Sequence, residues 1–202
     1  MTEGPLLWYL NRSSGVVGLV LLTAATVLGV LATGGRPGTR IPRFVLQSVH
    51  RNVALIAVVT VTAHVVAAVV DEFVDIRWWH ALVPFTGRYE RLWLGLGATA
   101  VQLLLVVTVS SLLRHRLRRR TWYSLHQSVY LLWLTSVLHG VGMGTDLADR
   151  WWPVTVGCVA AVTTAGTWRL ARALLESTAL DDRAARSRAE DDAMTMPIRR
   201  LP

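Results

Sequence analysis

The chain has 202 residues, of which 52% are hydrophobic, and a mean hydropathy of +0.41 indicates a membrane protein rather than a soluble domain. Its formal charge of +8 comes from arginine, because the sequence contains no lysine. The arginines lie in loops between apolar runs, so membrane topology explains them better than nucleic acid binding, and no nucleic acid partner is expected.

Five apolar runs, each of roughly 20 residues, predict five membrane spans. In chain order they cover residues 15–32, 44–70, 92–113, 122–143 and 151–174. The predicted fold class is all-α, an integral membrane helical bundle in contact with lipid. Three regions are expected: a short outer leader (1–14), the membrane domain (15–174) and a solvated, disordered cytoplasmic tail (175–202).

The distribution of charge between the loops predicts the orientation. The 34–44 loop and the 114–120 turn contain arginine and no acidic residue, whereas the 71–91 loop and the 144–150 turn are mixed. The positive-inside rule therefore places the first two in the cytoplasm. The expected location is the cell membrane, with several crossings, the N-terminus outside and the C-terminus in the cytoplasm.

Four histidines lie within two of the predicted spans. His50 and His64 are 14 residues apart in the second span, and His126 and His139 are 13 residues apart in the fourth. These separations correspond to roughly 21 and 19.5 Å along a helix. Because the two spans run in the same direction, His50 is expected level with His126 near the inner face. His64 is expected level with His139 towards the outer face.

Each pair is suited to bind one haem iron through two axial imidazoles, since facing helices commonly build such sites. The sequence has one cysteine, Cys158, and no Cys-x-x-Cys-His motif, so any haem is b-type and non-covalent. Histidines bonded only to backbone or serine groups are the alternative, which suits one histidine better than two matched pairs. Zinc would need its ligands clustered around one ion. The expected metal ligands are His50, His126, His64 and His139.

Helical geometry fits the second span better than the fourth. A separation of fourteen residues rotates the second histidine by about 1400°, which leaves it roughly 40° from the helix face of the first. A separation of thirteen residues leaves the second histidine about 140° from that face. The fourth span must therefore be tightened locally, or its imidazoles must approach their irons from different flanks. Trp133 lies between the two haem levels, where it is expected to pack or to lie on the electron path.

Arginines near the histidine levels are candidates for binding anionic haem propionates. Arg43 and Arg51 lie at the inner level. Arg12 lies at the outer end of the first span, where it could meet an outer propionate or an electron acceptor. Topology and lipid headgroups explain the inner arginines equally well. His80 and His115 are expected to face solvent and not to bind metal.

Four sequence segments and one spacing pattern are typical of bacterial members of a single membrane protein family. The pattern is H-x13-H and H-x12-H on alternate helices, and the segments are WYLNRSSG, VHRNVALIAVVTVTAH, LVPFTGRYERLWLGLG and WYSLHQSVYLLWLTSVLHG. On these grounds residues 8–146 resemble the ferric reductase-like transmembrane domain family. That family includes ferric reductases, NADPH oxidases and the haem-binding subunit of the methionine sulfoxide reductase system.

The resemblance implies an inner haem on His50 and His126 and an outer haem on His64 and His139. It also implies that Arg12 lies near the outer haem. Electrons would then pass from a cytoplasmic flavin to iron, oxygen or a partner protein outside.

Full ferric reductases and NADPH oxidases continue into FAD- and NADPH-binding domains, whereas this chain stops about 28 residues after the fifth span. No FAD or NAD(P) site is expected, so the donor is a separate flavoprotein or a quinol. The acceptor is ferric iron, oxygen or a partner reductase. The chain is expected to be the membrane cytochrome b component of an oxidoreductase, without catalytic side chains. The alternatives are a haem-binding sensor or assembly protein that transfers no electrons, and a membrane protein whose histidines bind no metal.

Overall fold

A computed structural model describes residues 4–33, 42–71, 76–143 and 152–195, and within these ranges the chain forms helices and no strand. This confirms the predicted all-α class. The helices are α1 (Gly4–Thr33), α2 (Arg43–Val70), α3 (Trp78–Leu82), α4 (Arg91–Leu112), α5 (Arg119–Gln127), α6 (Val129–Met143) and α7 (Trp152–Thr195).

Three of the described helices are long and apolar enough to cross a membrane. They contain the segments Leu7–Ala32, Phe44–Val70 and Arg91–Leu112. Large apolar side chains on their outer faces are exposed, such as Val59 at 69% and Leu105 at 62%, and lipid would cover them. The first three predicted spans therefore coincide with helices suited to the membrane. A total of five spans stays a prediction.

The fourth predicted span consists of two helices, α5 and α6, joined at Ser128. The backbone N–H of Ser128 donates to the carbonyl of Leu125 at 3.2 Å, a bond to the third preceding residue. Such a turn advances about 120° per residue rather than about 100°. It lies between His126 and His139, so it tightens the segment in the direction that their 13-residue separation requires.

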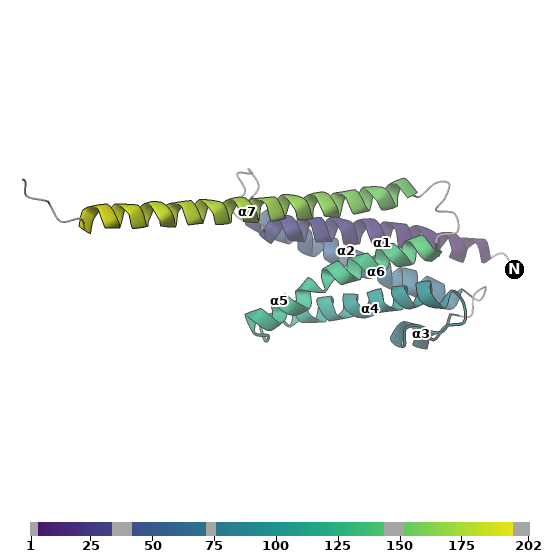
Figure 1. Ribbon diagram of the computed structural model, residues 1–202. Helices are drawn as coiled ribbons and strands as arrows, with labels where there is room; N and C mark the ends of the chain where they lie inside the picture. The colour runs from purple at the N-terminus through teal and green to yellow at the C-terminus, as the bar shows by residue number, and fades with distance from the viewer. Residues whose placement is uncertain (1–3, 34–41, 72–75, 144–151, 196–202) are drawn as a thin grey trace, which may run out of the picture.

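Near both ends, the described chain is helical beyond the limits predicted for the first and fifth spans. The leader predicted at residues 1–14 is helical from Gly4, because α1 begins there. The tail predicted to be disordered from residue 175 continues α7 to Thr195. This stretch has no glycine or proline and is rich in alanine, leucine, arginine and acidic residues, so nothing in it interrupts a helix. Figure 1 shows α7 extending well beyond the rest of the bundle.

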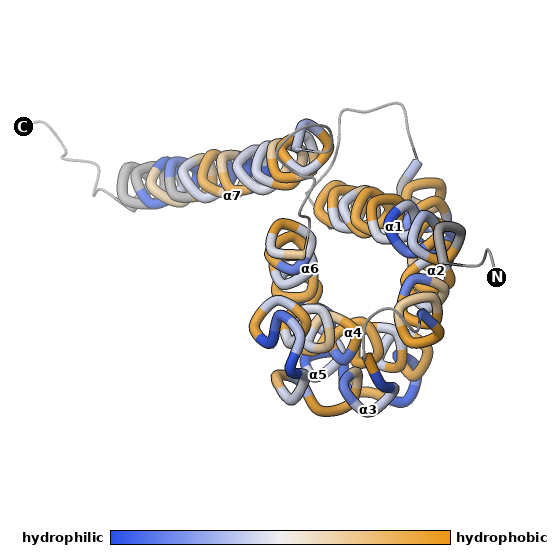
Figure 2. The backbone as a smooth tube through the Cα atoms, turned by 90° about the vertical axis from the view of Figure 1, so that its right-hand side faces the viewer, coloured by the Kyte–Doolittle hydropathy of each residue, from blue (hydrophilic) through white to orange (hydrophobic). Residues whose placement is uncertain are grey.

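In the view along the bundle, helices α1, α2, α4 and α6 form a ring, and α7 lies outside it beside α1 (Figure 2). One buried cluster joins these four helices, and each helix contributes a single residue to it. The residues are Leu22, Ala57, Ala100 and Leu132. Ala57 is seven residues from both histidines of α2, so this apolar layer lies midway between the two histidine levels.

Candidate functional site

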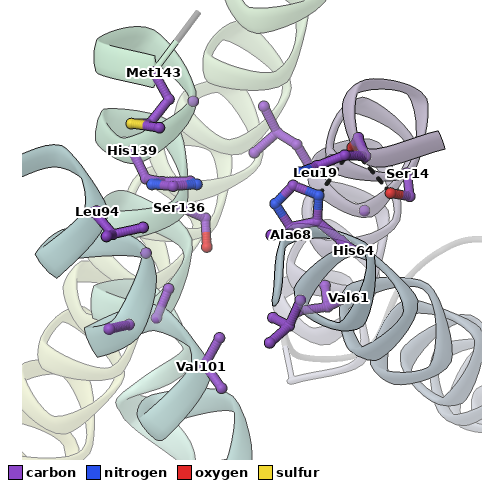
Figure 3. Close-up of a pocket in the computed structure, with 18 of the residues that line it drawn as sticks. Ser14, Leu19, Val61, His64, Ala68, Leu94, Val101, Ser136, His139 and Met143 are labelled. Carbon is purple, nitrogen blue, oxygen red and sulfur yellow. Dashed lines mark hydrogen bonds between the residues drawn. The ribbon is translucent and has the colours of Figure 1, made fainter. Parts of the chain in front are cut away.

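The histidine pair predicted to be the outer one lies across a cavity inside the bundle, named the outer cavity. His64 comes from α2 and His139 from α6, and their ring centroids are 6.3 Å apart with an interplanar angle of 75°. Figure 3 shows the two rings pointing toward one another from opposite sides. The cavity has a volume of about 390 Å³ and is lined by α1, α2, α4 and α6. Such a volume is within the range that binds small organic ligands.

The inner pair repeats this arrangement at the other end of the bundle. His50 of α2 and His126 of α5 have ring centroids 6.3 Å apart and an interplanar angle of 74°. The histidine nearer each N-terminus meets its counterpart, so α2 runs in the same direction as α5 and α6. The structure thus brings the four histidines together in the two pairs that their spacing predicted.

Three of the four rings are fixed through Nδ1 by main-chain carbonyl oxygens. A carbonyl oxygen only accepts, so Nδ1 carries the hydrogen and Nε2 keeps a free lone pair in each ring. Metal-binding histidines typically show this pattern, in which the second ring nitrogen donates to a carbonyl and fixes the tautomer and the ring plane. The bonds are His50 to Ala25, His64 to Asn11 and His139 to Trp93, each 2.9 Å long.

The separation of the rings fits a metal ion between them. Bonds of about 2.0 Å from a metal ion to imidazole nitrogen and ring radii of about 1.1 Å would place two centroids about 6.2 Å apart. Both pairs have a separation of 6.3 Å. Edge-to-face packing of two rings also falls in a range of about 4.5–7 Å. Packing by itself does not explain why the rings are anchored through Nδ1 in both pairs.

The number of ligands also bears on the kind of site. Within the described residues, no group of three or more histidine, cysteine, aspartate or glutamate side chains is placed to hold a metal ion. A four-ligand zinc site would need such a group. Haem iron needs only two axial ligands from the protein, because the porphyrin supplies the other four. The histidine pairs therefore suit haem better than a bare metal ion.

Two glycines make room for the outer imidazoles. A Cβ on Gly15 of α1 would lie 3.1 Å from Cε1 of His64. A Cβ on Gly97 of α4 would lie 2.6 Å from Nδ1 of His139, closer than real Cβ atoms come to other atoms. Each ring therefore packs directly against the backbone of a neighbouring helix, and a larger residue would displace it.

Trp133 lies in the bundle interior, beside the apolar layer that separates the two levels. Its side chain is buried, and its indole N–H donates to the hydroxyl oxygen of Thr23 at 2.9 Å. The neighbouring Leu132 belongs to the layer itself. Trp133 therefore packs between α6 and α1, and packing is one of the two roles expected for it.

The three candidate arginines have different surroundings. Arg12 is half-buried, lines the outer cavity, and lies with its guanidinium carbon 5.3 Å from the ring centre of Trp8. Arg51 follows His50 in α2 and is exposed. Arg43 is the first residue of α2, and its side chain lies outside the described part of the chain. Arg12 therefore lines the same cavity as His64 and His139, and no contact of Arg51 with the inner pair is seen among the described residues.

One histidine expected to face solvent is less exposed than predicted. His80 of α3 is half-buried and lines the outer cavity, whereas His115 is exposed as expected. The reason is that α3 folds back along α4, where the Gln102 side chain donates to the carbonyl of Leu82 at 2.7 Å. No sequence pattern signals this contact, because the two residues are 20 positions apart on different helices.

Comparison with known proteins gives one family. A family model described as a ferric reductase like transmembrane component matches residues 14–137. The match spans more than half of the chain and includes His50, His64 and His126, and it ends two residues before His139. Neither the curated proteins nor the solved structures contain a significant match. Members of the matched family generally bind haem. The chain therefore belongs to the ferric reductase-like transmembrane family.

Proposed function

We propose that this protein transfers electrons across the membrane through two b-type haems, each held by a pair of histidines. His50 and His126 are the ligands of the inner haem, and His64 and His139 those of the outer haem. Membership of the family supports transmembrane electron transfer in general. The observation that carries the detailed proposal is the spacing of 6.3 Å within both pairs, with the ring planes fixed through Nδ1.

The chain's own residues would hold each imidazole ready to bind iron. When bound by such a pair, haem would supply one-electron redox chemistry. Hydrogen bonds from Nδ1 to carbonyl oxygens fix the orientation of the ligands and raise their basicity. The buried apolar layer around Ala57 and Leu132 would separate the two levels by a region without polar side chains of its own.

The anionic propionate groups of the two haems would need cationic side chains as partners. Arg12 lines the outer cavity and is the partner that we assign to an outer propionate. Arg43 and Arg51 are the candidates for the inner haem, since both are within two turns of His50 on α2. Their alternative role is contact with lipid headgroups.

The electrons move from the cytoplasmic side to the outer side in this proposal. The turn between α4 and α5, together with the first two residues of α5, contains five exposed arginines and no acidic residue, which favours a cytoplasmic position. The N-terminus then lies outside and the C-terminus inside. The donor is a flavoprotein or quinol that meets the inner site, and the acceptor is ferric iron, oxygen or a partner reductase at the outer site.

The first test is the haem content of the purified protein. The wild type should show the Soret and reduced α-bands of b-type haem, with two haems per chain. His64→Ala and His139→Ala should each remove about half of the haem, whereas His115→Ala, at an exposed histidine, should remove none. Unchanged haem content in both cavity variants would refute the ligand assignment.

A second test separates an electron carrier from a haem-binding sensor or assembly protein. In sealed vesicles, the wild type should pass electrons from a reductant on one side to ferricyanide trapped on the other. His139→Ala should abolish this transfer while the inner haem is still reduced. A wild type that binds two haems but passes no electrons would favour the sensor or assembly role.

A further inference from the structure

The four histidines are not anchored alike. Three donate through Nδ1 to main-chain carbonyl oxygens, which no side-chain substitution removes. The Nδ1 of His126 instead lies 3.3 Å from the hydroxyl oxygen of Ser111 on α4. If Nε2 binds iron, Nδ1 carries the hydrogen and the hydroxyl accepts it. The orientation of His126 therefore depends on a side chain.

A second side chain lies against the same ring. Trp122 stacks on His126, with ring centroids 5.1 Å apart and an interplanar angle of 19°. The two residues are four positions apart on α5, so they share one face of that helix. None of the other three rings shows a stacked aromatic partner among the described residues. Ser111 and Trp122 together hold the imidazole from two directions.

The indole nitrogen of Trp122 has a further property. Nε1 is buried and has no hydrogen-bond partner among the described residues. A buried N–H without an acceptor is unfavourable, so such a group marks a position where an acceptor belongs. It lies beside the histidine pair to which we assign the inner haem. The carboxylates of a b-type haem are acceptors of the required kind.

We propose that Ser111 and Trp122 are positioning residues of the inner haem site, and this rests on the function proposed above. Ser111 fixes the imidazole of His126 through Nδ1. Trp122 fixes its ring plane by stacking and donates its indole N–H to a carboxylate of the bound haem. Side chains of α4 and α5 thus hold His126 of the inner pair, whereas His50 and both outer histidines are held by main-chain carbonyl groups.

The Ser111 part predicts a change confined to one haem. In Ser111→Ala the ligand loses its acceptor and becomes a weaker electron donor to iron, so the midpoint potential of the inner haem should rise. Its low-spin electron paramagnetic resonance signal should shift as well, while the outer haem keeps both values. Ser110→Ala is the matched control, because Ser110 bonds within its own helix to Val107. An inner haem with wild-type potential and signal in Ser111→Ala would overturn this part.

The Trp122 part is tested by two substitutions. Trp122→Phe keeps a ring for stacking and removes the N–H, so haem titrated into the haem-depleted protein should bind the inner site roughly 10- to 100-fold more weakly. Its resonance signal should stay near that of the wild type. Trp122→Leu removes the stacking too, and the signal should also shift. Wild-type affinity in Trp122→Phe would refute the N–H bond, and an unshifted signal in Trp122→Leu would refute the stacking role.

The outcome also shows which proposal has failed. If the proposed function is wrong, the wild type binds no haem at the inner pair and His126→Ala changes nothing. If only the positioning role is wrong, the wild type binds two haems, His126→Ala removes one, and the Ser111 and Trp122 variants behave like the wild type.

Discussion

Replacing Gly97 with alanine is the sharpest test of how the outer site is built. The added Cβ would lie 2.6 Å from Nδ1 and 2.7 Å from Cε1 of His139. Real Cβ atoms essentially never come within 3.0 Å of another atom, so ring and backbone must separate by at least 0.4 Å, the difference between 2.6 and 3.0 Å. The His139 ring cannot move freely, because its Nδ1 donates a hydrogen bond to the carbonyl of Trp93. Trp93 lies on α4, one turn before Gly97.

Forcing an extra methyl group into such a contact costs about 1–3 kcal/mol. If that cost falls on the ligand-binding conformation, the outer site should bind haem roughly 5- to 100-fold more weakly. Titration of haem into the haem-depleted protein measures this directly, and redox titration shows which site is affected.

Two glycines supply the controls. A Cβ on Gly29 would lie 3.5 Å from Cε1 of His50, which is an ordinary contact, so Gly29→Ala should leave the inner site nearly unchanged. A Cβ on Gly140, next to His139, would meet nothing within 4 Å. Gly140→Ala therefore tests whether an alanine near the site lowers haem affinity without a close contact, and the affinity should stay near that of the wild type. Normal haem affinity at the outer site in Gly97→Ala would refute the close contact between α4 and His139.

Three further predictions concern packing around the sites. Thr23→Val leaves the buried indole N–H of Trp133 without an acceptor, so thermal unfolding should show a loss of about 1–3 kcal/mol. The same substitution should cost much less in a Trp133→Phe background, which has no N–H to satisfy. Leu132→Ala should lower stability by about 2–5 kcal/mol in the same assay, while both haem signals remain. Gln102→Leu should release α3 and speed modification of His80 by diethylpyrocarbonate. An unchanged modification rate would contradict the proposed tether.

The histidine pairing was predictable because it depends on few quantities. The separations of 14 and 13 residues, and the parallel direction of the second and fourth spans, were sufficient to place His50 opposite His126 and His64 opposite His139. The angular mismatch of the 13-residue separation also pointed to a local tightening. The turn at Ser128 supplies such a tightening. These features follow from helix geometry along single segments.

The parts that were missed depend on contacts between segments. Ser111 looks like any other serine in an apolar helix until α5 places His126 beside it. Trp122 looks like an interfacial aromatic residue until its ring is seen against the same imidazole. His80 was assigned to a solvent-facing loop because the bond from Gln102 to α3 has no sequence signature. The mixed charge of the tail from residue 175 favours a solvated or disordered segment, whereas α7 continues to Thr195 because the stretch contains no helix-breaking residue.

The packing of the helices indicates how bound haem would contribute to stability. Helix α2 supplies one ligand to each site, yet among the described residues it packs mainly against α1 and makes few contacts with α4, α5 or α6. Protein side chains therefore join α2 to α1 but only weakly to the helices that supply the opposite ligands. A ligand that binds only the folded state stabilises it, most strongly where it bridges weakly packed elements.

Haem-depleted protein in detergent should therefore unfold at a lower temperature than the two-haem form. Backbone amides of α2 should gain the most hydrogen exchange, and those of α1 the least. A chain carrying both His50→Ala and His64→Ala should reproduce this pattern without depletion. Equal changes in α1 and α2, or identical exchange in the two preparations, would show that protein packing alone fixes α2 and that the bundle does not depend on ligands bridging α2 to α5 and α6.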